Sequence, residues 1–122
     1  MSANPSPGFR KRPDYRIAVA PAGKRVTVDF AGNTIADTRE ALAMKEGDYP
    51  VVYYVPRKDV KMERLERTSH HTHCPFKGEA SYYSIKGGPE NAVWSYEKPY
   101  AEMRAIEGLL AFYPDKVSIR TQ

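Results

Sequence analysis

The sequence predicts a mainly β (α+β) protein, a single compact domain of antiparallel strands in two small sheets with one short helix. Several short segments alternate apolar and polar residues with a period of two, as half-buried strands do. Turn-forming residues such as Gly, Pro and Asn separate these segments. A strand–helix–strand rhythm, which would indicate a parallel α/β sheet, is missing. The expected strands cover residues 25–32, 34–38, 51–55, 79–85, 92–97 and 116–120.

The first two segments predict a β-hairpin. Val26, Val28 and Phe30 alternate with polar residues, as expected for a strand with one buried face. The stretch Gly-Asn-Thr at 32–34 then turns the chain into the return strand.

One segment predicts a helix, and a second is ambiguous. In residues 99–108, Pro99 suits the first helical position and Gly108 suits the end. Residues 38–47 could form a helix capped by Thr38, but their apolar residues also fit a strand. Both interpretations stay open from the sequence.

The charge distribution separates the N-terminus from the rest of the chain. Residues 17–122 are expected to form the domain, and residues 1–16 a flexible basic arm with too few apolar residues to fold. Most of the net charge of +4 lies on this arm. Its charged residues are Arg10, Lys11, Arg12, Asp14 and Arg16. The body is nearly neutral, which argues against a nucleic-acid partner, although the arm could contact phosphates weakly.

Composition also limits the cellular setting. No apolar run approaches the ~20 residues that span a bilayer, so no membrane association is expected. The N-terminal segment lacks the apolar core of a secretory signal. The single cysteine, Cys74, excludes an internal disulfide. The expected location is therefore the cytoplasm.

Three histidines and the cysteine occur within five positions, and a metal site is the first interpretation of this cluster. His70, His71, His73 and Cys74 are all chemically able to bind zinc. In an extended chain they point to different faces, and the chain has no further His or Cys to complete a tetrahedron. We therefore expect no metal site here.

A reactive thiol is the second interpretation. Positive charge from Lys77 and from the adjacent histidine would favour the thiolate form of Cys74. A nucleophile also needs a positioned base, and His73 is badly placed for that role because it is the immediate neighbour in sequence.

A rigid binding loop is the third interpretation. Pro75 restricts the backbone, and Gly78 allows a sharp turn into the following strand. The loop would present Lys77 beside Thr72 and close to Tyr82. Such an arrangement suits a small anionic or planar ligand.

Ordered motifs along the chain identify a resemblance to a known family. They comprise Tyr54, Pro56, Asp59 and Val60; Thr72, Cys74, Pro75, Lys77, Gly78, Ala80 and Tyr82; Trp94, Tyr96 and Pro99; and Phe112 and Tyr113. With these motifs in the same order, the sequence from about Arg25 onward resembles the domain-of-unknown-function 427 family. That small, mainly bacterial group also carries a nucleotidyltransferase-type label.

The resemblance implies a compact β fold similar to the two-sheet β-tent topology, here without paired CxxC zinc ligands. It also implies that Tyr54, Asp59, Thr72, Cys74 and Lys77 form one surface, and that the histidines are incidental. Nucleotidyl transfer usually needs paired carboxylates that hold Mg²⁺, or a Gly-rich phosphate loop. Asp59 has no carboxylate two residues further on, so the label alone indicates no reaction.

The leading expectation is a domain that binds a small anionic or planar molecule in a polar-aromatic pocket. Lys77 would recognise charge and Thr72 would form a hydrogen bond. The pocket walls would come from Tyr54, Tyr82, Trp94 and Tyr96.

Two alternatives from other functional classes remain open. The first is an enzyme that uses Cys74 as nucleophile, or Asp59 as acid/base, at the same surface. The second is an interaction module whose tyrosine-rich strand edges pair with another protein or a second copy, so a homo-oligomer is possible. The sequence names no cofactor, reaction or pathway.

Overall fold

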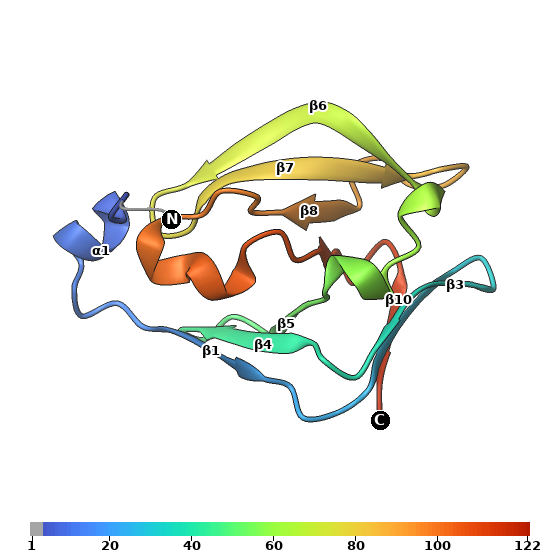
Figure 1. Ribbon diagram of the computed structural model, residues 1–122, viewed down its shortest axis with the longest axis horizontal. Coiled ribbons are helices and arrows are strands. Elements are labelled where there is room, and N and C mark those ends of the chain that lie inside the picture. Colours follow the sequence, from blue (N-terminus) through green and yellow to red (C-terminus); the bar gives the residue numbers. More distant parts are fainter. Residues whose placement is uncertain (1–3) are drawn as a thin grey trace.

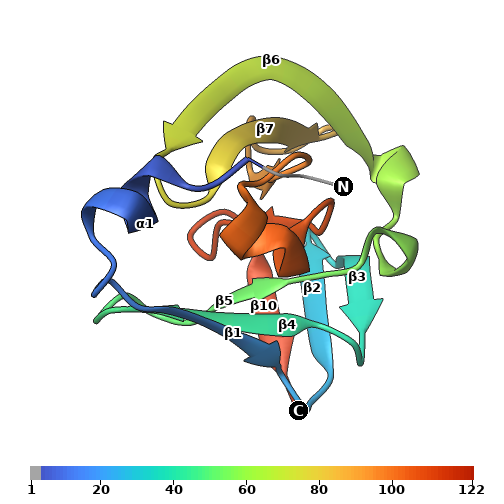
Figure 2. The same cartoon turned by 60° about the vertical axis from the view of Figure 1, so that its left-hand side comes forward.

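The computed structural model describes residues 4–122 and confirms the mainly β class. Within those residues, the strands form three small antiparallel sheets rather than the expected two (Figure 1). Two of the sheets lie on opposite sides of the molecule, and the third closes one end of the space between them (Figures 1 and 2). No helix among the described residues combines the length and apolarity needed to cross a membrane.

The first sheet has the order β1-β4-β5, with β1 at Ile17–Pro21, β4 at Leu42–Glu46 and β5 at Val52–Tyr54. It resolves the ambiguous segment 38–47 as a strand. Met44 is buried opposite Val19 on one side and Val52 on the other. The two flanking strands supply backbone hydrogen-bond partners that a helix in this segment would not use.

The second sheet has the order β10-β2-β3, with β10 at Ser118–Thr121, β2 at Val26–Phe30 and β3 at Asn33–Thr38. The predicted hairpin is confirmed, but its turn begins one residue earlier, at Ala31 instead of Gly32. Ala31 and Gly32 both have positive φ, of 52° and 81°. Such a two-residue turn matches the right-handed twist of the paired strands.

The third sheet is the largest and has the order β6-β7-β8-β9. Its strands are β6 (Leu65–Cys74), β7 (Gly78–Ile85), β8 (Val93–Ser95) and β9 (Ala111–Phe112). The histidine cluster therefore lies on a long strand. Strand β7 is buried on both faces and separates two apolar clusters, with Tyr83 in one and Tyr82 in the other.

The helices are short. They are α1 (Pro7–Lys11) and the 3-10 turns η1 (Arg57–Asp59), η2 (Met62–Arg64) and η3 (Ala101–Ile106). The helix expected over 99–108 is thus present as a kinked 3-10 segment. The kink lies at Met103. Met103 and Ile106 are both buried in the apolar cluster between the first and third sheets, which includes Met44 and Tyr82. In so short a segment, the free energy gained by burying two apolar side chains is larger than the free energy gained from regular helical hydrogen bonds.

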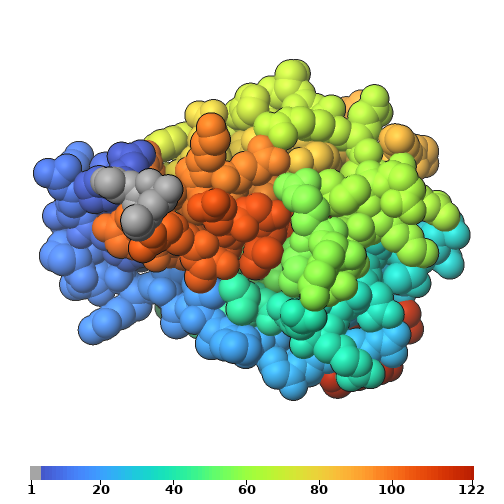
Figure 3. Space-filling model, viewed as in Figure 1, coloured from blue at the N-terminus to red at the C-terminus, as the bar shows by residue number. Residues whose placement is uncertain are grey.

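The N-terminal segment differs from the unfolded arm expected over 1–16, of which residues 1–3 lie outside the described part. Ser6 caps α1, is fully buried, and donates a hydrogen bond of 2.8 Å to the carbonyl of Pro75. Gly8 donates its backbone N–H to the same oxygen at 2.8 Å. The segment lies against residues near 100 at one end of the molecule (Figure 3). Tertiary contacts therefore supply the burial that the arm's own composition lacks.

Candidate functional site

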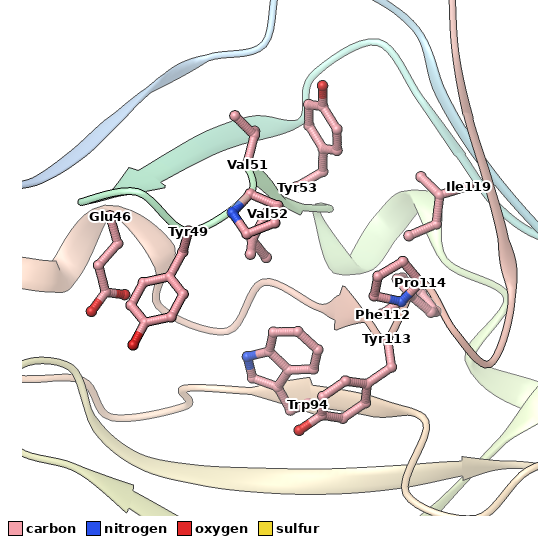
Figure 4. Close-up of a pocket in the computed structure, with 11 residues that line it drawn as sticks. Glu46, Tyr49, Val51, Val52, Tyr53, Trp94, Phe112, Tyr113, Pro114 and Ile119 are labelled. Carbon is pink, nitrogen blue, oxygen red and sulfur yellow. The ribbon is translucent and has the colours of Figure 1, made fainter.

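A two-chambered cavity lies between the first and third sheets. Figure 4 shows the residues that line its outer chamber. The outer chamber has a volume of about 610 Å³ and the inner chamber about 180 Å³. The chambers adjoin, because they share Glu46, Tyr49, Pro50, Val52, Trp94 and Tyr113. Sites for small molecules commonly occupy ~300–1,000 Å³, so the cavity is large enough for one.

Period-two alternation on β4 and β5 builds one wall of the cavity. Met44 and Glu46 lie two residues apart on β4, and Val52 and Tyr54 lie two residues apart on β5. Their side chains therefore share one face of the sheet. The opposite wall comes from β7 and β8. Figure 4 shows Glu46, Tyr49 and Val52 on one side of the cavity and Trp94 with Tyr113 on the other.

The outer chamber is predominantly apolar and aromatic. The residues found only in its lining are Val51, Tyr53, Phe112, Pro114 and Ile119. The rings of Trp94 and Tyr113 lie with their centroids 4.5 Å apart, at an interplanar angle of 43°. Tyr49 is 65% exposed and Val51 44% exposed, and these are the exposed large apolar side chains of the described residues. An apolar surface of this kind at the edge of a cavity is typical of a binding site.

The inner chamber contains an ion pair. Lys77 Nζ lies 2.6 Å from Glu46 Oε1, and the Tyr15 hydroxyl donates to Glu46 Oε2 at 2.6 Å. Burial alone would raise the pKa of Glu46, but the hydrogen bonds from Lys77 and Tyr15 outweigh it and lower that pKa. The hydrogen bond to Glu46 is also the main cause that raises the pKa of Tyr15 to about 12, and burial is the second cause. Glu46 is therefore a carboxylate at neutral pH.

Tyrosine hydroxyls supply the remaining polar groups of the inner chamber. Burial raises the pKa of Tyr54, Tyr96 and Tyr113, so these hydroxyls stay protonated at neutral pH. Trp94 Nε1 donates to the Tyr54 hydroxyl at 3.4 Å. The chamber thus offers neutral hydrogen-bonding groups around one ion pair.

The loop that carries Lys77 is held from both sides. Phe76 stacks on Tyr15 with ring centroids 4.3 Å apart, and it meets Phe9 edge-on at 5.1 Å. Gly78 has φ of +122°, and a Cβ there would lie 3.3 Å from Pro99 Cα. Glycine is required at this turn, because an L side chain would be both strained and crowded. The N-terminal segment and the residues near 99 therefore determine where Lys77 points.

The structure brings together most of the predicted ligand-binding residues. Tyr54, Lys77, Tyr82, Trp94 and Tyr96 all line the inner chamber. Thr72 lies outside it, on the exposed side of β6, where it shares a hydrogen bond of 2.8 Å with the Tyr82 hydroxyl. It therefore reaches the chamber only through Tyr82.

The two catalytic candidates lie apart from each other. Cys74 is half-buried against the apolar cluster between the first and third sheets, and its Sγ lies 3.9 Å from Lys77 Nζ. Asp59 lines a different cavity together with Ile35 and Lys58, and accepts a hydrogen bond of 2.7 Å from Thr38. The single surface that the family resemblance implied therefore does not include Asp59.

The three histidines occupy exposed positions on β6 and contact different residues. The ring of His70 meets Tyr82 edge-on, His71 lies 4.0 Å from a Glu79 oxygen, and His73 lies beside Tyr100. Among residues 4–122, no group of three or more His, Cys, Asp or Glu side chains is arranged to hold a metal ion.

Sequence reasoning missed Glu46 and Val52 in the lining of the cavity, and also Tyr15, which donates a hydrogen bond to Glu46. The available signal was the alternation of Leu42, Met44 and Glu46, which places a carboxylate on the apolar face of a strand. A charged residue on such a face needs a partner, and Lys77 provides it.

The sequence model of the family described as a domain of unknown function (DUF427) matches residues 18–122. The chain belongs to this family, and the resemblance noted from the motifs is confirmed. A search among curated proteins found no match to the sequence.

Proposed function

We propose that the protein binds a small planar molecule in the two-chambered cavity, with its ring in the outer chamber and a polar group in the inner one. The observation that carries the proposal is the continuity of the two chambers. An apolar aromatic space leads directly to the ion pair of buried Lys77 and partly buried Glu46. Small-molecule sites generally combine an apolar lining with a few polar groups that fix orientation.

The aromatic wall supports a planar ligand in particular. The rings of Trp94 and Tyr113 line one side of the outer chamber, and Val52 lies on the opposite side (Figure 4). A flat ring can contact both walls at once, and aromatic side chains favour offset or edge contacts with it.

The charge of the inner chamber supports a planar ligand more than an anionic one. Lys77 was expected to recognise charge, but its ammonium group is already paired with Glu46 at 2.6 Å. A carboxylate or phosphate entering the chamber would meet both members of the pair, so the attraction to Lys77 would be offset by repulsion from Glu46.

The proposal can be tested by calorimetric titration with uncharged bicyclic rings, namely 2-quinolinone and N-methyl-2-quinolinone. We expect saturable binding to the full-length protein. Val52→Trp should abolish it by filling the junction of the two chambers. Ala20→Trp, which adds the same side chain to the exposed edge strand β1, should bind as the parent does. No heat of binding for either ring, or equal binding by Val52→Trp, would refute the proposal.

An enzyme with Cys74 as nucleophile is the second candidate, because Cys74 Sγ lies within 3.9 Å of the Lys77 ammonium. Against it, Cys74 is not among the residues that line either chamber. Alkylation by iodoacetamide distinguishes the two functions. A binding domain should react no faster than glutathione at neutral pH, and Cys74→Ser should bind quinolinones normally. Much faster alkylation would favour the enzyme.

A further inference from the structure

The inner chamber contains one positive and one negative side chain, so its formal charges cancel. Glu46 is the charged residue that lines the outer chamber, and Glu46 and Lys77 are the charged residues that line the inner one, within the described part of the chain. Both are nearly buried, with side chains 19% and 11% exposed. A ligand with a net charge would enter a partly desolvated space that offers no net counter-charge.

Both members of the pair keep hydrogen-bonding capacity that the protein does not use. A carboxylate has about four lone-pair sites, and Glu46 accepts from Lys77 and Tyr15. An ammonium group has three protons, and Lys77 directs them to Glu46 and, over a longer distance, to Cys74. The chamber thus presents one acceptor and one donor side by side, 2.6 Å apart.

We propose that the ligand is a planar heterocycle with a lactam edge and no net charge, and that Glu46 and Lys77 recognise this edge. A lactam carries its N–H and C=O on neighbouring ring atoms, so the N–H can donate to Glu46 while the C=O accepts from Lys77. The ring behind this edge extends into the outer chamber beside Trp94. This inference rests on the proposed binding function and adds the chemical class of the ligand.

Three bicyclic probes of similar size separate the possibilities. The probe 2-quinolinone has the complete lactam edge, N-methyl-2-quinolinone lacks the donor, and 2-naphthoate replaces the edge with an anion. A hydrogen bond to a charged group is worth about tenfold in affinity or more. We therefore expect 2-quinolinone to bind at least about tenfold more tightly than either of the other probes.

Variants of the pair should change this preference in a directed way. Glu46→Gln leaves Lys77 uncompensated, so binding of 2-quinolinone should weaken and binding of 2-naphthoate should strengthen, each by about tenfold. Lys77→Met should weaken the binding of both 2-quinolinone and 2-naphthoate. Glu79→Gln, which changes an exposed carboxylate on β7 outside both chambers, should leave all three affinities unchanged.

The outcomes separate this inference from the proposed function. Equal binding of the three probes, or tighter binding of 2-naphthoate to the parent protein, would overturn the lactam inference while leaving the cavity as a binding site, provided that Val52→Trp still abolishes binding. No binding of either quinolinone would overturn both. The comparison of the methylated and unmethylated rings uses only the parent protein, so it decides the matter even if Glu46→Gln or Lys77→Met fails to fold.

Discussion

Lys77 and Glu46 form a 2.6 Å ion pair between the loop after β6 and the end of β4, 31 residues apart in the sequence. The pair connects the first and third sheets across the cavity. Both side chains are nearly buried, so neither charge has enough water nearby to remain alone at low cost. The pair therefore has a structural role in addition to its proposed role in recognition.

The losses of stability caused by removing Glu46 and Lys77 should be coupled rather than independent. Glu46→Gln and Lys77→Met should each lower the free energy of unfolding by about 1–3 kcal/mol, because each leaves a poorly solvated group without its charged partner. The double variant should lose less than the sum of the two single losses. Urea denaturation of the four proteins measures this coupling, and additive losses would show that the pair contributes nothing to stability.

The stability of the protein should depend on pH through Glu46. Its pKa is lowered in the folded state from an ordinary value of 4.5, so the unfolded chain binds more protons as the solution becomes acidic. The contribution of Glu46 is fully present above that value and is lost as the pH falls below it. Between pH ~6 and pH ~3, Glu46→Gln should therefore lose less stability than the parent.

Equilibrium unfolding across this range tests the expectation. Glu97 will leave a residual acid dependence in the variant: burial would raise its pKa, but hydrogen bonds from Arg67 and Tyr83 lower it overall. Glu79→Gln serves as the control and should follow the parent curve. Identical curves for Glu46→Gln and the parent would argue against a carboxylate at position 46 that is stabilised by folding.

The docking of the N-terminal segment should depend on Gly8. A Cβ at this position would lie 2.7 Å from Phe76 Cδ1 and 2.8 Å from the carbonyl oxygen of Pro75. The backbone oxygen cannot move aside as a flexible side chain could, so Gly8→Ala should release the segment. Trypsin should then cleave after Arg10 and Lys11 faster than in the parent, while the rest of the domain stays folded.

The exposed helical position Pro7 provides a matched control for this experiment, since Pro7→Ala shortens a side chain without adding a clash. It should be cleaved at nearly the rate of the parent. Equal resistance of Gly8→Ala would mean that the segment is held mainly by contacts other than the Gly8 and Ser6 hydrogen bonds to Pro75.

Ser95 provides a test of the apolar interior next to the cavity. Its Oγ is the buried side-chain polar atom that has no hydrogen-bond partner among the described residues, and the residue is fully buried. Ser95→Ala removes an unsatisfied group and should leave the free energy of unfolding unchanged or raise it by about 1 kcal/mol. Ser6→Ala, which removes a 2.8 Å hydrogen bond to Pro75, should lower it. A clear loss in Ser95→Ala would indicate a buried water bound to this hydroxyl.

Much of the cavity wall could be predicted from local spacing. Tyr54, Tyr82, Trp94 and Tyr96 were expected on strands, and the structure places all four on the inner chamber. Alternation determines which face of a strand a side chain occupies, and aromatic residues on an inward face must pack against an opposing surface.

Residues whose role depends on a distant partner could not be found in this way. Glu46 lay in a segment that fitted both a helix and a strand, and Tyr15 lay in an arm that was expected to stay unfolded. Glu46 accepts hydrogen bonds from Tyr15 and Lys77, each of which lies 31 residues away in the sequence. No local pattern reports such a contact.

By itself, the sequence determined the β class, the family, the strands that carry Tyr54, Tyr82 and Trp94, and the rigid loop that presents Lys77. Period-two alternation and turn residues act over a few positions, and those features can be read locally. The tertiary structure alone decided that there are three sheets, that the N-terminal segment is docked, and that Glu46 neutralises Lys77. These features arise from burial and pairing between distant segments, whose free energies exist only when the whole chain is folded.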